Sequence, residues 1–247
     1  MRMESYIKQG DCLEIMKDIP DKSIDMILCD LPYGTTQCKW DTVIPFDLLW
    51  RQYCRITKDN AAIVLFGAEP FASHLRLSNL QMYKYDWIWD KVKGTGFLNA
   101  KKQPMRNHEV ICVFYKNQCT YNPQMTVGQQ KVSKRRKGLQ TDVYGQADED
   151  YIYNSSERYP RSIQVFSTDT QKSSLHPTQK PIPVLKQLIQ IYTDIGDVVI
   201  DPVAGSGSTL RACAELNRSC YGFEIKKEFY NKSKNLMLSD VNMALEI

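Results

Sequence analysis

The sequence predicts an α/β protein of the doubly wound type, with a mostly parallel sheet and helices on both of its faces. Two features of the 247-residue chain indicate this class. Short apolar runs of strand length recur along the chain, and segments with an apolar residue every three or four positions lie between some of them. This alternation favours parallel strands joined by crossover helices.

The expected strands are residues 24–29, 61–66, 85–89, 110–115, 198–201 and 220–224. One helix is expected to begin near Pro183, because apolar residues follow it with helical spacing at 185, 188, 189 and 192. Gly196 stands where a left-handed C-cap would end this helix. A second helix is expected over about 208–217, with Leu210 and Cys213 on one face.

The apolar runs are too short for a membrane protein. The longest, residues 61–66, is far below the roughly 18 residues of a spanning helix. The first eleven residues lack the apolar stretch of a secretory signal, so we expect a cytoplasmic protein without membrane contact. The eight cysteines are scattered, and none has the C-x-x-C spacing of a structural zinc site. No metal site is therefore expected.

The positive charge is concentrated in one part of the chain. Residues 91–138 hold eleven Lys and Arg but one acid, Glu109, a net of +10. The whole chain carries +4, so the remainder carries −6. A basic block on an otherwise acidic protein favours a surface that binds nucleic acid over a merely solvated loop.

Within this basic region the strand pattern stops. From 117 to 174 the apolar runs disappear, and Gln, Tyr, Asn, Ser and basic residues dominate. An α/β domain seldom needs so long a structureless connection, so we interpret 117–174 as an inserted functional element or a mobile segment. The short pattern Gly94-Thr-Gly96, which precedes it, predicts a loop only.

A glycine-rich turn near the C-terminus indicates a cofactor site. The run Val-Val-Ile-Asp201-Pro-Val-Ala-Gly205-Ser-Gly207-Ser-Thr209 predicts a buried strand, a tight turn and the start of a helix. Leu210 stands where the dinucleotide fingerprint and the P-loop need glycine, so neither motif fits. Glu224 lies about 20 residues after Gly205, a spacing suited to binding both ribose hydroxyls of an adenosine-containing cofactor.

A second cluster follows the strand at 24–29. Asp30-Leu-Pro32-Tyr33 places a carboxylate, backbone carbonyls and an aromatic ring at the edge where doubly wound folds bind ligands. Asp30 and the carbonyl of Leu31 or Pro32 can accept the two N–H bonds of an amine on a heterocycle, while Tyr33 stacks on the ring. An ordinary turn explains the same residues about as well.

Together these motifs resemble the beta class of amino-methylating DNA methyltransferases. Asp30-Leu-Pro-Tyr33, His176-Pro-Thr-Gln-Lys-Pro181 and the glycine-rich run at 201–209 are the segments that carry the resemblance. The catalytic motif precedes the glycine-rich one, as in that family. Leu31 departs from the family pattern, which has a proline there. The resemblance implies a Rossmann-like methyltransferase sheet with 1–116 as its catalytic half, 117–174 as a target-recognition insertion and 175–247 as its cofactor-binding half.

The resemblance also implies roles for individual residues, with S-adenosylmethionine as the cofactor. The expected catalytic residues are Asp30, Pro32 and Tyr33. The expected cofactor-binding residues are Asp11, Cys12, His176, Thr178, Lys180, Asp201, Gly205, Gly207, Ser208, Thr209, Phe223 and Glu224. The cations expected to hold DNA phosphates are Lys131, Lys134, Arg135, Arg136 and Lys137.

The implied reaction is methyl transfer to the N6 amino group of adenine in double-stranded DNA, with the base flipped out of the duplex. In the family, aspartate at the first motif position goes mostly with adenine and serine with cytosine, so Asp30 favours adenine. The alternatives are N4-cytosine methylation, RNA methylation and a non-catalytic DNA-binding subunit. Family members often pair, so a homodimer is among the expected assemblies.

Overall fold

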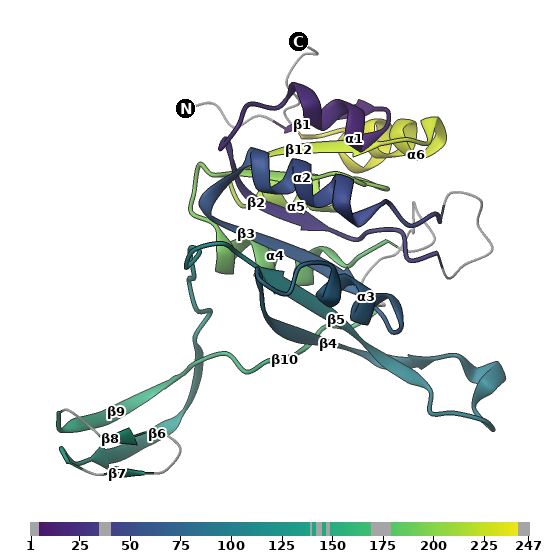
Figure 1. Cartoon of the computed structure of the whole chain (residues 1–247). Coiled ribbons are helices and arrows are strands. Elements are labelled where there is room, and N and C mark those ends of the chain that lie inside the picture. The colour runs from purple at the N-terminus through teal and green to yellow at the C-terminus, as the bar shows by residue number, and fades with distance from the viewer. Residues whose placement is uncertain are drawn as a thin grey trace. The chain divides into compact units, whose positions relative to one another are not determined.

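An eight-stranded sheet forms the centre of the larger of two units in the computed structural model (Figure 1). The structure describes residues 5–34, 41–138, 140–141, 145–146, 149–168 and 179–241. The larger unit comprises the chain up to Asn122 and from Ser162 onward, and the smaller unit comprises 123–161. Each unit is described by itself below.

The strands of the large sheet lie in the order β1-β12-β11-β2-β3-β5-β4-β10. Their bounds are β1 Ser5–Gln9, β2 Ile24–Cys29, β3 Thr57–Gly67, β4 Tyr83–Thr95, β5 Arg106–Phe114, β10 Ile163–Val165, β11 Val198–Asp201 and β12 Ser219–Glu224. All neighbours pair in parallel except β5, which runs antiparallel to β3 and β4. The predicted doubly wound, mostly parallel fold is confirmed.

Helices cover both faces of this sheet. The helices of one face are α1 Cys12–Ile15, α2 Phe46–Ile56 and α3 Phe71–Ser78, and those of the other are α4 Ile182–Tyr192 and α5 Ser208–Glu215. Alternation along β2 explains the two layers: Met26 and Leu28 pack with α4 and α5, whereas Ile27 and Cys29 pack with α1 to α3. The strand is apolar on both sides because both sides are buried.

Shorter elements complete the larger unit. They are the 3₁₀ turns η1 Met16–Asp18 and η2 Phe97–Asn99, helix α6 Lys227–Lys232 and the π-helical turn η4 Ser233–Met237. In the described part of the chain, no helix is both long and apolar enough to span a membrane.

Two details of the helix predictions are wrong. Helix α4 ends at an extended cap residue, Thr193, and Gly196 lies three residues later in the turn that leads to β11. Its φ of +98° favours glycine, but the residue serves that turn and not the helix end. Helix α5 ends at Glu215, two residues before the predicted end, since Asn217 adopts a φ of +58°.

The smaller unit corrects the expectation that 117–174 lacks strands. Strands β6 Thr126–Arg135 and β9 Tyr151–Arg158 pair antiparallel, and the two-residue strands β7 Gln140–Thr141 and β8 Gly145–Gln146 form a second ladder. Val127 and Ile152 are largely exposed. Backbone pairing rather than apolar burial defines these strands, and apolar periodicity therefore did not reveal them.

Candidate active site

A cavity of about 580 Å³ opens at the carboxyl edge of the large sheet. Its volume lies within the range of sites for small ligands and cofactors. It brings together nine residues that the sequence singled out: Asp30, Pro32, Tyr33, Lys180, Asp201, Gly205, Ser208, Thr209 and Glu224. All the described residues that line it belong to the larger unit. Two motifs from opposite ends of the sequence therefore face one space.

The residues that follow β2 form one wall of the cavity. The Tyr33 hydroxyl donates a hydrogen bond to Asp30 Oδ1 over 2.7 Å. The Tyr33 ring stacks on Phe71, with 4.8 Å between ring centroids and 24° between planes. Burial raises the pKa of Asp30 and the pKa of Tyr33. The Tyr33 side chain is thus fixed by two contacts and stays a neutral donor.

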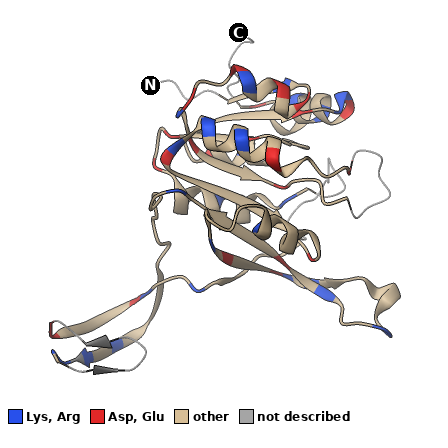
Figure 2. Ribbon diagram, viewed as in Figure 1, with Lys and Arg blue, Asp and Glu red and all other residues tan. Residues whose placement is uncertain are grey.

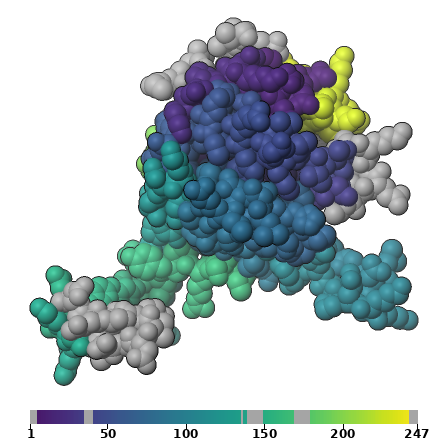
Figure 3. All heavy atoms as spheres, viewed as in Figure 1, coloured from purple at the N-terminus to yellow at the C-terminus, as the bar shows by residue number. Residues whose placement is uncertain are grey.

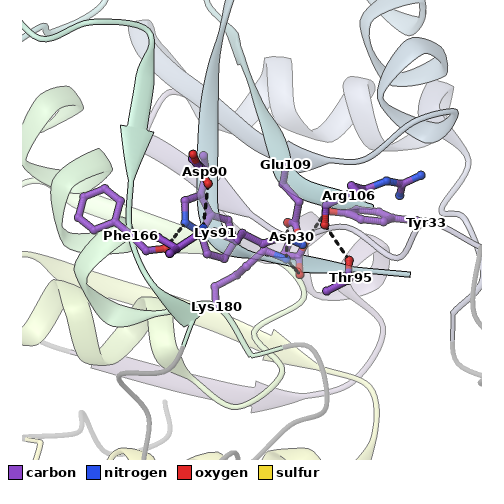
Figure 4. Close-up of polar contacts among 11 residues, drawn as sticks. Asp30, Tyr33, Asp90, Lys91, Thr95, Arg106, Glu109, Phe166 and Lys180 are labelled. Atoms are coloured by element: carbon purple, nitrogen blue, oxygen red, sulfur yellow. Dashed lines mark hydrogen bonds and ion pairs between the residues drawn. The ribbon is translucent and has the colours of Figure 1, made fainter. Parts of the chain in front are cut away.

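Lys180 lies against this carboxylate (Figure 4). Its Nζ is 2.6 Å from Asp30 Oδ2 and 3.3 Å from Glu109 Oε2. Burial alone would lower the pKa of Lys180, but the two carboxylates outweigh it and raise that pKa. An ammonium nitrogen therefore sits at hydrogen-bonding distance from the catalytic candidate. Its predicted role as a cofactor contact stays a prediction.

Glu109 and Lys91 are site residues that the sequence reasoning missed. Lys91 Nζ is 3.1 Å from Glu109 Oε1, so Glu109 links two buried lysines. Burial raises the pKa of Glu109, but the two lysines outweigh burial and hold that pKa below its usual value. The available signal was an acid directly before the apolar run 110–114, the single acid in a basic segment. A charged side chain at the end of a buried strand is costly unless an opposite charge pairs with it.

The glycine-rich turn between β11 and α5 forms the opposite wall. Gly205 and Gly207 have φ values of +52° and +83°, which favour glycine. The Gly205 amide donates to Glu224 Oε2 over 3.0 Å, and the Lys226 amide donates to Oε1 over 2.7 Å. The turn thereby fixes the carboxylate at the end of β12.

Two buried acids in this wall carry raised pKa values. Burial raises the pKa of Glu224, and it raises the pKa of Asp201 to about 7. Asp201 Oδ1 accepts a hydrogen bond from the Val203 amide, which fixes the first residue of the turn. Buried carboxylates with raised pKa values are typical of functional sites.

Several predicted cofactor residues do not line the cavity. Asp11 caps α1, with its Oδ1 accepting from the Leu13 amide over 2.8 Å. Cys12 and Phe223 are buried in the core, and Gly207 is the N-cap of α5. Their cofactor roles stay predictions. His176 and Thr178 lie outside the described residues.

The donor set fits S-adenosylmethionine. Glu224 offers a carboxylate suited to the two ribose hydroxyls, and Ser206, Ser208 and Thr209 add hydroxyl groups beside the glycine turn. Phe229 and Val203 provide apolar contact area.

The fold and this site define an α/β protein with a ligand cavity at the carboxyl edge of its sheet, and comparison with known proteins gives the family. A family model described as DNA methylase, for N6 and N4 amino-methyltransferases, matches residues 24–235. The chain therefore belongs to this family of S-adenosylmethionine-dependent DNA amino-methyltransferases.

Individual relatives agree with the family. The Type II methyltransferase M.HpaI of Haemophilus parainfluenzae is 27% identical over 256 residues, covering 97% of this chain and 76% of its own. The crystal structure of the M1.HpyAVI-SAM complex has a TM-score of 0.65 at 23% identity, covering 93% of this chain and 97% of that one. PvuII DNA methyltransferase (cytosine-N4-specific) has a TM-score of 0.67 at 16% identity, covering 94% and 86%. Both structures share the fold.

Proposed function

We propose that this protein methylates the N6 amino group of adenine at specific sites in duplex DNA. Asp30 supports adenine, because aspartate at the first position of the catalytic motif goes mostly with adenine in this family. N4-cytosine methylation is the alternative, because a cytosine-N4-specific enzyme has the same fold. The proposal extends to a cytoplasmic enzyme of the kind found in restriction-modification systems.

The observation that carries the proposal is that a nitrogen donor reaches Asp30 inside the cavity. Lys180 Nζ lies 2.6 Å from Asp30 Oδ2, and Glu224 lines the other wall of the same cavity. The carboxylate is therefore accessible to an N–H donor within the same space as the candidate ribose site. Tyr33 adds a planar ring beside that point.

The residues at this wall would act by positioning the amine. The bound cofactor supplies an electrophilic methyl group. Asp30 and the carbonyl of Leu31 or Pro32 accept the N–H bonds of the target amine, which turns its lone pair out of the ring plane. These hydrogen bonds strengthen as the nitrogen loses planarity, and rate follows from positioning and from that differential binding. A paired amine is inaccessible in the duplex, so the base must flip out.

The test is incorporation of labelled methyl from S-adenosylmethionine into unmethylated duplex DNA, followed by nucleoside analysis. Label in N6-methyladenine is the expected result, and label in N4-methylcytosine would establish the alternative. Asp30→Ala is expected to reduce the methyl-transfer rate at least about a hundredfold while cofactor affinity is retained. Asp47→Asn, an exposed site on α2, is the matched control.

A non-catalytic DNA-binding subunit is the rival of another class. The Asp30, Tyr33 and Glu224 geometry disfavours it, because a subunit without activity has no need of a formed site. Binding of cofactor and DNA with no label in any nucleoside would establish the rival. Label in RNA but not in DNA would instead move the substrate to RNA.

DNA is proposed to contact the segment 117–174 through phosphates. Its cations at 131, 134, 135, 136 and 137 lie in or next to β6, in a ladder with little apolar burial. Such contacts give affinity that depends on salt but not on sequence. The target-recognition role of this segment and a homodimeric assembly stay predictions.

A further inference from the structure

The connection between β4 and β5 is a second feature directed at the substrate, one that the catalytic motifs do not include. Every residue from 92 to 108 is exposed, whereas Lys91 is buried and Glu109 is half-buried. We call residues 92–108 the β4–β5 arm. Figures 1 and 3 show it projecting from the carboxyl edge of the sheet. Because both stem residues line the active-site cavity, the arm begins at the mouth of that cavity.

The composition of the arm pairs positive charge with apolar groups at its tip. It holds four cations and no acid (Figure 2): Lys93, Lys101, Lys102 and Arg106. At the tip, Phe97 is 77% exposed and Leu98 is 97% exposed. Single exposed apolar residues are ordinary, but two adjacent ones at the end of a projecting cationic arm indicate a binding surface.

The tip has a defined shape. Gly96, with φ of +87°, turns the chain into the 3₁₀ turn Phe97–Asn99. Four backbone hydrogen bonds hold the tip, among them Asn99 N to Gly96 O at 2.9 Å and Lys102 N to Asn99 O at 2.8 Å. The prediction that Gly94-Thr-Gly96 forms only a loop is wrong: Gly94 and Thr95 end β4, and Gly96 starts the turn that presents the two apolar side chains.

The base of the arm carries backbone strain. Val92 has a φ of +67°, which is rare for a β-branched residue, and its amide donates to Asp90 Oδ1 over 2.8 Å. The register between β4 and β5 shifts between Asp90 and Thr95. Such irregularities redirect a strand and are kept where direction matters. Here the affected direction is that of the arm relative to the cavity.

We propose that the β4–β5 arm is a DNA wedge: its cations hold phosphates beside the target, and Phe97 and Leu98 enter the base stack when the target base leaves it. This inference rests on the proposed function, because it needs a duplex substrate. Charge complementarity selects DNA as the occupant, and apolar side chains inserted between bases are an established means of unstacking a duplex. The arm's stem borders the cavity that would receive the flipped base.

The first test is Phe97→Ala/Leu98→Ala on two duplexes that carry the mapped target site, one fully paired and one mismatched at the target base. A mismatched base costs less to extrude, so the variant is expected to lose about tenfold in methyl-transfer rate on the paired duplex and to recover on the mismatched one. Leu77→Ala/Leu80→Ala, at two exposed apolar sites of the same unit, is the matched control.

A wild-type rate on the paired duplex, or an equal loss on both duplexes, overturns the wedge. A changed sedimentation coefficient of the variant would show that a second copy of the chain covers the tip, which also overturns it. Failure of the wild-type protein and of the control to methylate DNA would count against the proposed function instead, and DNA binding then tests the arm.

The binding test compares Lys101→Gln/Lys102→Gln with Lys84→Gln/Lys116→Gln, two exposed lysines at the other end of the same strand pair. The plot of log K against log salt has a negative slope. Removing two phosphate contacts is expected to reduce the magnitude of that slope by about 2 for the arm variant. The control is expected to keep the wild-type slope. An unchanged slope for the arm variant removes the arm from the DNA surface, whatever the enzyme's activity.

Discussion

At the scale of single residues, the charge cluster around Lys180 controls the state of Asp30. Lys180 contacts both Asp30 and Glu109, and Lys91 contacts Glu109 from the other side. The negative charge of Glu109 also raises the pKa of Asp30, beyond the larger effect of burial. We therefore expect Glu109 to act through Lys180 and Asp30 as a positioning residue.

Replacing Glu109 with Gln tests this coupling. In this variant Lys180 keeps its ion pair with Asp30. The pKa of Asp30 is expected to fall, because the negative charge of Glu109 no longer raises it. The acid limb of the kcat–pH profile is expected to move to lower pH, while the plateau rate drops about tenfold because the ammonium competes with the target amine. Cofactor affinity, measured by calorimetry, is expected to be unchanged. Glu215→Gln is the control, and an acid limb that stays in place or rises would contradict the coupling.

Asp201 predicts a pH dependence of stability. Asp201 is 4% exposed, and burial raises the pKa of its carboxyl to about 7, above the ordinary value of 3.8 that applies in the unfolded chain. The folded state therefore binds more protons between these values, so this group's contribution is full below pH 3.8 and is lost as the pH rises through 7. The Asp201→Asn variant has no carboxyl at this position, so its free energy of unfolding does not show this decrease with pH.

Urea unfolding of the two proteins without cofactor, at pH 5 and at pH 8, measures the effect. The free energy of unfolding of Asp201→Asn relative to wild type is expected to increase with pH, by a few kcal/mol at most. A difference that stays constant between the two pH values would show that Asp201 titrates as it does in the unfolded chain.

At the scale of elements, apolar patterns predicted the buried part of the sheet. Strands β2 and β11 have the expected bounds, because both are buried between helices and are apolar apart from Asp25 in β2 and Asp201 at the end of β11. Strand β1 and helices α2 and α3 were not predicted, although α2 buries Leu49, Tyr53 and Ile56. Its polar residues and short length dilute the pattern. Pairing of β6 with β9 depends on contacts remote in sequence, which periodicity cannot report.

The sequence predicted those site residues that belong to short motifs at strand ends. Asp30, Tyr33, Gly205 and Glu224 lie at strand ends, and parallel strands bring such ends to one edge. Glu109 lies on the antiparallel strand β5, and its partner Lys180 comes from a distant part of the sequence. That pairing follows from the order of strands in the sheet, which the sequence pattern did not supply.

Helix α1 gives a test that separates two roles of Asp11. Its side chain caps α1, and the adjacent Gly10 amide donates to the Glu224 carbonyl at 3.0 Å. Asp11→Ala is expected to lower the free energy of unfolding by about 1 kcal/mol, whereas Asp11→Asn keeps the cap. If both variants also bind cofactor less tightly, the predicted cofactor contact is real. Cofactor affinity that is unchanged in Asp11→Asn restricts the residue to capping.

At the scale of the whole molecule, we expect the two units to have separable tasks. All the described residues that line the cavity belong to the larger unit, and the smaller unit contains strand β6 with its cations. Replacing 123–161 with a flexible linker of about ten residues is expected to leave cofactor affinity at the wild-type value. The magnitude of the salt dependence, the slope of log K against log salt, is expected to fall by about 4, because the five predicted phosphate contacts at 131, 134, 135, 136 and 137 are lost.

Calorimetry with S-adenosylmethionine and DNA anisotropy at several salt concentrations measure both effects. A linker variant that has lost cofactor binding but keeps its helical circular dichroism would show that the smaller unit supports the cavity. A slope equal to that of the wild type would place the phosphate contacts elsewhere on the larger unit.

The order of strands also has a consequence for biosynthesis. Strand β2 pairs with β11, and β1 pairs with β12, so strands made early have partners that are made near the end of the chain. At ordinary rates of translation, about 5–20 residues per second, these edges wait for their partners for roughly ten to forty seconds. The nascent first half therefore lacks partners for these strand edges throughout that interval, and we expect it to depend on chaperones. Because Glu224 is also made late, free cofactor cannot stabilise this half while it is being synthesised.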